Sequence, residues 1–244
     1  MSAFFHRLAV GFGIGIFLLN AVTIFAADYT SLAGYTLQIP EGWVAASFAN
    51  LNQLPPEIQK YLVDQKLDLK AIDLLVLGPE EFGQFRSNLN VVVTPGQIPV
   101  GKMTPEQFQK QATDQYQKLG VTISNHTVRK VNVAEREVFE MIYDATMPWA
   151  MDPIRQRQLM IPGGGKTFVV TFTSTLEGYA EDSKIFDAIQ QTIQVPVETW
   201  SLGNGILSSG LRGGILGGLI GGAVAVFAKF RKKSPPATNA ESDN

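Results

Sequence analysis

The sequence contains no cysteine and only two histidines among its 244 residues. The absence of cysteine excludes disulfide bonds, a thiol nucleophile and a thiolate metal site. His126 is the one histidine outside the first 27 residues, so a Ser-His-Asp triad or a zinc site there would depend on it. It lies in the strand-like segment VTISNHTVRK without a nucleophile motif nearby, and we expect its side chain to face solvent.

A nucleotide-binding loop is also missing, although Gly165-Lys166-Thr167 looks like the end of one. The Walker pattern requires a glycine at position 160, which is Met160, and a helix after the lysine. The residues that follow, FVVTFTS, read as a strand, so the three glycines 163–165 predict a hairpin turn. Acidic pairs adjoin turns or strand edges, where charges face water. We therefore predict no catalytic, cofactor-binding or metal-binding residues, and no nucleotide.

The charge balance excludes nucleic acid as a partner. Residues 28–204 hold 14 basic and 20 acidic residues, a net charge of −6. Nucleic-acid binding needs a basic surface that meets the phosphates.

Long apolar runs occur only at the two ends of the chain. Near the start, Arg7 precedes an unbroken apolar run over residues 8–19, and small residues follow up to Ala26. This pattern is typical of a signal peptide over residues 1–26, cleaved after Ala26 or one residue later. An uncleaved N-terminal anchor is the alternative, because residues 8–26 are nearly long enough to span a bilayer.

The second apolar run, residues 206–228, predicts a transmembrane helix. Its 23 residues would extend for about 34 Å, against about 30 Å for the hydrocarbon core of a bilayer. Arg212 lies close enough to one end to reach the headgroups. Four basic residues at positions 229–233 place that end in the cytoplasm, and Arg7 gives the same orientation. We expect residues 28–200 to form an extracytoplasmic domain, in the periplasm or an equivalent compartment, and residues 229–244 a basic and then disordered cytoplasmic tail.

Small residues line one side of this predicted helix. Glycines recur at spacings of three and four, which lie on one face and allow a second helix to approach closely. This face predicts a homo-oligomer or a partner membrane protein, whereas a plain anchor that tolerates glycine and a pore stay open as alternatives. The residues of the face are Gly210, Gly213, Gly214, Gly217, Gly218, Gly221 and Gly222.

The middle of the chain alternates between strand and helix patterns. Strands are expected at residues 35–39, 43–48, 72–77 and 89–93, with a short proline-led helix after residue 54. MTPEQFQKQATDQYQKLG predicts a helix with a capping box at Thr104 and Gln107. Four more strands follow at 121–131, 136–145, 154–161 and 167–175, and a last helix at about 180–193.

One connecting segment, MPWAMDPIRQRQ, stands out by composition. Trp149 lies in it, with Arg155 and Arg157 shortly after, and Trp and Arg are common anchors in protein interfaces. The segment is a possible interaction loop, although Trp149 packed under the sheet edge explains the same pattern.

This order of elements resembles the PsbP family, named after an extrinsic subunit of photosystem II, and the small bacterial domains grouped with it. The residues that carry the resemblance are YTLQIPEGW, VFEMIYDATM, RQRQLMIPGGGKTFVVTFTST and SKIFDAIQQTI, within about residues 35–195. The resemblance implies an α+β fold, an antiparallel sheet with helices packed on both faces, and a binding or assembly role without catalysis. A C-terminal span departs from the family pattern, and no functional residue is transferred.

Three functional hypotheses follow. The first is a single-pass, membrane-anchored extracytoplasmic binding or assembly domain that associates through its glycine face. The second is an extracytoplasmic hydrolase or transferase with an unrecognised site. The third is a membrane-active oligomer driven by the glycine helix, with the domain as a cap.

Overall fold

The computed structural model describes residues 25–47, 49–64, 72–80, 85, 87–147 and 152–197. The predicted signal-peptide core, the predicted transmembrane helix over 206–228 and the tail lie outside these residues. Within the described residues, no helix is long and apolar enough to span a membrane.

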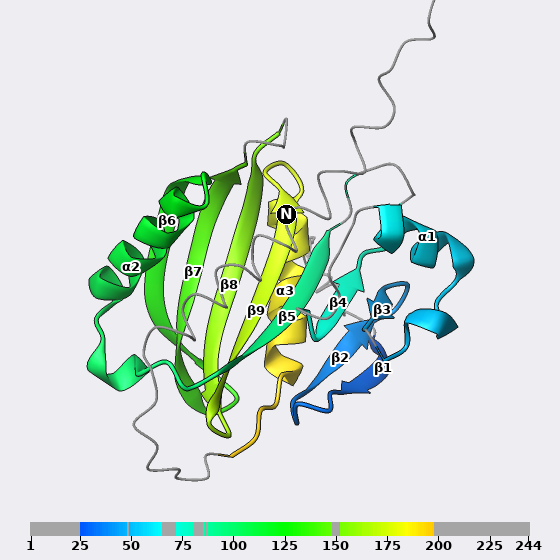
Figure 1. Cartoon of the computed structure of the whole chain (residues 1–244), viewed down its shortest axis with the longest axis horizontal. Coiled ribbons are helices and arrows are strands. Elements are labelled where there is room, and N and C mark those ends of the chain that lie inside the picture. Colours follow the sequence, from blue (N-terminus) through cyan, green and yellow to red (C-terminus); the bar gives the residue numbers. More distant parts are fainter. Residues whose placement is uncertain are drawn as a thin grey trace, which may run out of the picture.

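A seven-stranded antiparallel sheet forms the centre of the fold (Figure 1). Its strand order is β3-β4-β5-β9-β8-β7-β6, so the last four strands form a meander with β6 at one edge. The α+β class is confirmed. The strands are β3 Val44–Ala46, β4 Leu74–Leu77, β5 Asn88–Pro95, β6 Thr122–Val133, β7 Arg136–Thr146, β8 Ile154–Gly163 and β9 Lys166–Thr175.

Helix α2, Pro105–Lys118, covers one face of the sheet beside β6 and β7. The predicted capping box is present: the Gln107 backbone N–H donates to the Thr104 hydroxyl, and the Thr104 N–H donates to the Gln107 side chain at 3.0 Å. The helix buries Phe108, Ala112 and Tyr116, and the Phe108 ring stacks on Phe139 of β7 at 4.6 Å. We call this side of the sheet the α2 face.

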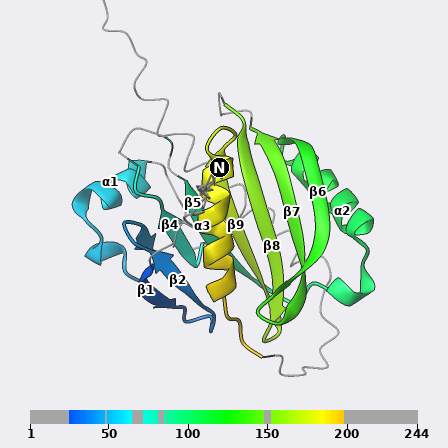
Figure 2. The ribbon, with the colours of Figure 1, turned by 180° about the vertical axis from the view of Figure 1, so that it is seen from behind.

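Helix α3, Tyr179–Thr192, lies across the opposite side, which we call the α3 face (Figure 2). Phe186 and Ile189 are buried there, and the Phe186 ring lies 4.7 Å from Phe172 of β9. The expected arrangement of helices on both faces is therefore confirmed.

The N-terminal part of the chain adds two smaller units. Strands β1, Phe25–Thr30, and β2, Thr36–Pro40, form a separate two-stranded sheet on the α3 face, where Thr36 bridges to Gln194 beyond α3. Helix α1, Pro56–Asp64, packs on β4 from the α2 face through Ile58 and Leu62. The chain also contains two short 3-10 helices, Leu51–Gln53 and Val100–Lys102.

Strand β1 was not expected from the sequence, because its first two residues fall in the predicted cleavage region. Pairing between residues 27–30 and β2 lies wholly beyond the predicted cut after Ala26.

Two hairpins of the meander have two-residue turns with positive φ at both positions. Gly164 and Gly165, at φ 55° and 77°, connect β8 to β9, which confirms the predicted glycine turn. Ala134 and Glu135 adopt the same region, at φ 50° and 61°, between β6 and β7. Side chains disfavour this region, so the second turn is held by the strands on either side.

Candidate functional site

The α2 face carries two rows of buried polar side chains that run across neighbouring strands. Strand pairing places Tyr143, Gln156, Thr173 and Asn88 in one row, on β7, β8, β9 and β5. A second row, one step along the strands, contains Gln158, Thr171 and Asn90. All seven side chains are fully buried. We call them the two polar rows.

The first row is joined by a chain of hydrogen bonds that begins on α2. The hydroxyls of Tyr116 and Tyr143 are hydrogen-bonded to each other. Tyr143 donates to Gln156 Oε1 at 2.7 Å, and Gln156 Nε2 donates to the Thr173 hydroxyl at 3.0 Å. Three strands and one helix are therefore connected through neutral groups.

Burial fixes the protonation of the two phenols in this chain. It raises the pKa of Tyr116 well above its ordinary value, and hydrogen bonds with Tyr143 and Gln158 offset only part of the effect. Burial and the neighbouring phenol raise the pKa of Tyr143 as well. Both hydroxyls stay protonated at neutral pH and act as hydrogen-bonding groups rather than as bases.

The second row contains an amide that the fold leaves unsatisfied. Gln158 Nε2 donates to the Thr171 hydroxyl at 3.1 Å. Asn90 lies opposite Thr171 on β5 with no exposed surface, and within the described part of the chain neither its Nδ2 nor its Oδ1 has a hydrogen-bond partner. A buried polar group without a partner costs about 1–3 kcal/mol.

The polar rows separate two apolar clusters on the same face. Val92 and Val169, next to the second row along β5 and β9, belong to the cluster under α2. Leu75 and Leu77 lie opposite Asn90 and Asn88 on β4 and belong to the cluster under α1. The two polar rows thus lie between two apolar clusters of the core.

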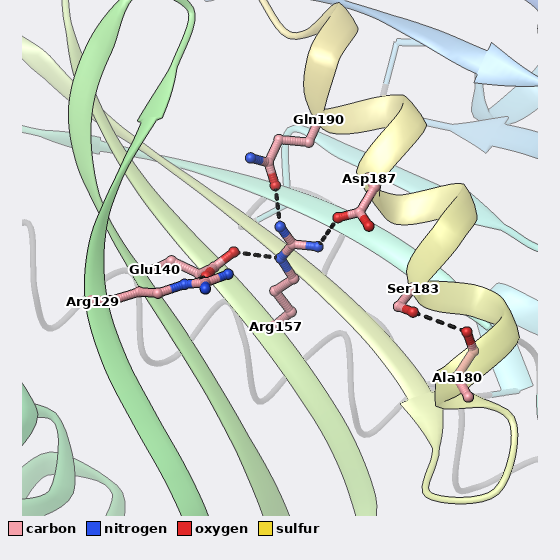
Figure 3. Close-up of polar contacts among 7 residues, drawn as sticks. All are labelled: Arg129, Glu140, Arg157, Ala180, Ser183, Asp187 and Gln190. Atoms are coloured by element: carbon pink, nitrogen blue, oxygen red, sulfur yellow. Dashed lines mark hydrogen bonds and ion pairs between the residues drawn. The ribbon is translucent and has the colours of Figure 1, made fainter.

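On the α3 face, a network of charges fastens the helix to the sheet (Figure 3). Arg157 of β8 donates to Glu140 Oε1 at 2.6 Å, to Asp187 Oδ1 at 2.5 Å and to Gln190 Oε1 at 2.6 Å. Arg129 of β6 binds the other oxygen of Glu140. Burial alone would lower the pKa of Arg157. The hydrogen bond to Asp187 and the negative charges of Glu140 and Asp187 raise it by more, so the net pKa lies above the ordinary value.

A second ion pair lies on the same face, two residues along β8. Arg155 binds both oxygens of Asp144, at 2.6 and 3.0 Å, and its guanidinium lies 5.4 Å from the centre of the Tyr179 ring. Asn125 also donates to Asp144, at 2.7 Å. Burial raises the pKa of Asp144, but the hydrogen bonds from Arg155 and Asn125 lower it more, so its net pKa lies below the ordinary value.

The residues predicted to form one interaction loop do not lie together in a loop. Arg155 and Arg157 belong to β8, and their guanidinium groups bind acidic side chains of the same domain. Only 8% of the Arg157 side chain is exposed, so it does not present an interface anchor. Trp149 and the seven glycines of the predicted helix face lie outside the described residues.

The prediction that His126 faces solvent is wrong. Its ring is half-buried because α2 covers this part of β6, with Nε2 2.6 Å from the Gln109 amide. In the described part of the chain, no group of three His, Asp or Glu side chains has a geometry that suits a metal ion.

Sequence reasoning missed the two polar rows. The signal was present as three i, i+2 pairs of polar residues: Asn88 with Asn90, Gln156 with Gln158, and Thr171 with Thr173. In a strand, such alternation ordinarily marks the solvent face. Here all of these side chains are fully buried.

Comparisons with known proteins find structural likeness but no family. No family model and no curated protein matches the sequence. Similar solved structures include cyanobacterial PsbP (CyanoP) from Synechocystis sp. PCC 6803, with 14% identity over 77% of this chain and 98% of that one, at a TM-score of 0.43. LpqN of Mycobacterium tuberculosis, involved in cell envelope biogenesis, has 8% identity over 70% and 90%, at 0.42. The Saccharomyces cerevisiae Ran-binding protein Mog1p has 12% identity over 70% and 95%, at 0.44. Values this low assign neither family membership nor function.

Proposed function

We propose that this chain is a PsbP-like binding or assembly domain without catalytic activity, held on the outer side of the cell membrane by its C-terminal segment. The observation that carries the binding role is the buried carboxamide of Asn90, which has no hydrogen-bond partner within the described residues. A group kept at a cost to stability points to a role of this part of the domain beyond folding.

The chemistry of the two polar rows favours binding over catalysis. They contain only amides, hydroxyls and a phenol, and the pKa of the Tyr143 phenol is raised. A general base needs a pKa near the working pH, which none of these groups has. On the opposite face, the three donor groups of Arg157 are bound to Glu140, Asp187 and Gln190, which gives that arginine a structural role.

The sequence supports the membrane attachment. The predicted span over 206–228 is followed by a basic cluster, and Arg7 before the first apolar run gives the same orientation. The glycine face of that span supports association with a second copy or with a partner membrane protein.

Reporter fusions test the proposed topology. A reporter that is active only in the cytoplasm should work after Asn244 and fail when it is inserted in the middle domain. Cytoplasmic activity in the middle domain contradicts the topology. The proposed topology also requires that the full-length chain stays in the membrane after a carbonate wash.

Cross-linking in detergent tests the glycine face. The double substitution Gly214→Leu and Gly218→Leu should abolish the cross-linked species, because leucine side chains keep the two helices apart. Leu216→Ile is the matched control, since it preserves volume within the same segment. Unchanged cross-linking in the double variant shows that these glycines do not mediate association.

A further inference from the structure

We propose that the turn between β1 and β2 inserts Leu32 into the surface of the lipid bilayer to which the chain is attached. This inference rests on the proposed membrane attachment and adds a second contact, between the folded domain and the lipid. It assigns one end of the domain to the membrane side. The residue that makes the contact is Leu32, whose side chain is 100% exposed.

Residues 31–34 form a tight turn with Leu32 at its apex. The Gly34 N–H donates to the Ser31 carbonyl at 3.0 Å, and Gly34 has a φ of 96°, which glycine adopts without strain. Turns are dominated by Gly, Pro, Asn, Asp and Ser. The two central positions of this turn instead hold Leu32 and Ala33, so it presents an apolar side chain to the outside without a charge that would lose its hydration.

Hydrogen bonds hold this turn in place on the domain. The hydroxyls of Ser31 and Tyr35, on either side of the apex, both donate to Asp73 Oδ2, at 2.6 and 2.7 Å. The Ala33 N–H donates to the Ser31 hydroxyl at 2.9 Å. Ser31 and Tyr35 are buried, and Asp73 directly precedes β4. Leu32 is therefore fixed in its exposed position before any contact, which lowers the conformational entropy lost on insertion.

The chain leaves the domain beside this turn. Thr36 pairs antiparallel with Gln194, which brings Gly34 next to Pro196: a Cβ on Gly34 would lie 2.9 Å from Pro196 Cγ. Arg136 donates to the Pro196 carbonyl at 2.9 Å and holds the end of the described chain on the sheet. In Figure 1 the β1–β2 turn, the β8–β9 turn and the last described residues lie together at the lower end of the domain.

The length of chain up to the predicted span keeps this end near the bilayer. Residue 197 is the last described one and the span begins at residue 206, so 206 − 197 = 9 steps separate them, and they reach at most about 32 Å. The ten residues of β9 alone extend for about 33 Å toward the opposite end, where Leu176 follows the strand. The fully exposed leucine therefore lies at the end that the span holds close to lipid.

Attachment and insertion have different consequences for the domain. A single leucine buries too little apolar surface to bring a free protein to a membrane. In a chain that a span already holds there, the contact becomes intramolecular and its effective concentration is high. The span alone leaves the domain free to turn about its connection, whereas insertion of Leu32 fixes the end that faces the lipid.

Because the chain has no cysteine, a single label can be placed at each end of the domain. Leu32→Cys and the matched control Leu176→Cys, in the full-length chain, are labelled with a nitrobenzoxadiazole fluorophore. The labelled chains are reconstituted in phosphatidylcholine vesicles, with and without phospholipid that has a nitroxide near the top of its acyl chain. The label at position 32 should lose about half of its fluorescence to the nitroxide, and the label at position 176 should lose little.

A second set of variants tests Leu32 without a label on it, since the fluorophore is itself apolar. Glu135→Cys places the label on the exposed turn between β6 and β7, next to Arg136 at the same end of the domain. In this background, Leu32→Asp should reduce the quenching about twofold or more, whereas Leu32→Ile should leave it unchanged. Neither substitution should change the melting temperature, because the Leu32 side chain is fully exposed.

The outcomes separate this inference from the proposed function. Equal quenching at positions 32 and 176 in a chain that stays in the vesicles after a carbonate wash, or equal quenching in Leu32→Asp and Leu32→Ile, overturns the insertion and leaves the attachment in place. Emission from position 32 that moves to shorter wavelength without quenching by the nitroxide shows contact with a second copy of the chain and overturns the lipid contact. Release of the chain by the wash overturns the membrane attachment itself.

Discussion

Arg157 and Glu140 form an ion pair between adjacent strands, with Arg157 Nε donating to Glu140 Oε1 at 2.6 Å and 8% and 1% of the two side chains exposed. The same guanidinium reaches Asp187 and Gln190 on α3, so one arginine connects β7, β8 and the helix. Helix α3 is therefore held on the sheet by charge as well as by the apolar contacts of Phe186 and Ile189.

Replacing Arg157 by alanine should lower the free energy of unfolding by about 3–5 kcal/mol, because Glu140 and the helix lose a buried partner. Urea denaturation of the purified domain measures the change. The double variant Arg157→Met with Glu140→Gln should recover part of the loss, since no buried carboxylate then remains. Lys184→Ala, which removes an exposed pair with Glu181, is the control and should change stability by less than about 1 kcal/mol.

Acidification should weaken the fold through Asp144. Its pKa lies below the ordinary value of 3.8. The ion pair with Arg155 therefore stabilises the fold at pH values above 3.8, and this contribution is lost as the pH falls toward the folded-state pKa. We expect the wild type to lose stability below about pH 4. In Asp144→Asn, the slope of stability against pH in this range should be shallower, and an equal slope contradicts the assignment.

Alkaline titration should leave Tyr116 and Tyr143 protonated in the folded state. Their folded-state pKa values are raised above the ordinary 10.0, so their contribution to stability is complete below that value and is lost as the pH rises above it. Phenolate absorbance at about pH 11 should therefore be lower in the native protein than in urea. Equal absorbance in a protein that is still folded contradicts the burial of these hydroxyls.

Removing the Tyr143 hydroxyl should break the first polar row. Tyr143→Phe removes the hydroxyl that donates to Gln156 Oε1 and that is hydrogen-bonded to Tyr116, at a cost of about 1–3 kcal/mol. Thermal unfolding measures the change. Tyr116→Phe in the Tyr143→Phe background should add less than it does alone, because the two hydroxyls contact each other.

The turn between β6 and β7 should be open to stabilisation. Ala134 and Glu135 both have positive φ, which Asn and Gly adopt more readily. Replacing the pair by Asn-Gly should raise the free energy of unfolding by about 1–2 kcal/mol. The corresponding turn at Gly164 and Gly165 already has favourable residues, and Gly165→Ala there should destabilise the protein.

Local patterns in the sequence determined most of the elements of this protein. The capping box at Thr104 and Gln107, the glycine turn after Gly163 and the period-two strands each depend on neighbouring residues, so their physical cause is visible in a short stretch. The same is true of the α+β class, which follows from the order of those elements. The two-stranded sheet of β1 and β2 escaped prediction because its first strand overlaps the apolar N-terminal segment.

The roles of individual polar residues were decided only by tertiary structure. Arg157 resembled a loop anchor in the sequence, yet β8 brings it against Glu140 and α3, where burial makes its ion pairs structural. Asn90 was not singled out in the sequence, yet the folded chain buries its side chain completely. Alternation along one strand reports which residues share a face, whereas the segments that cover that face come from distant parts of the chain.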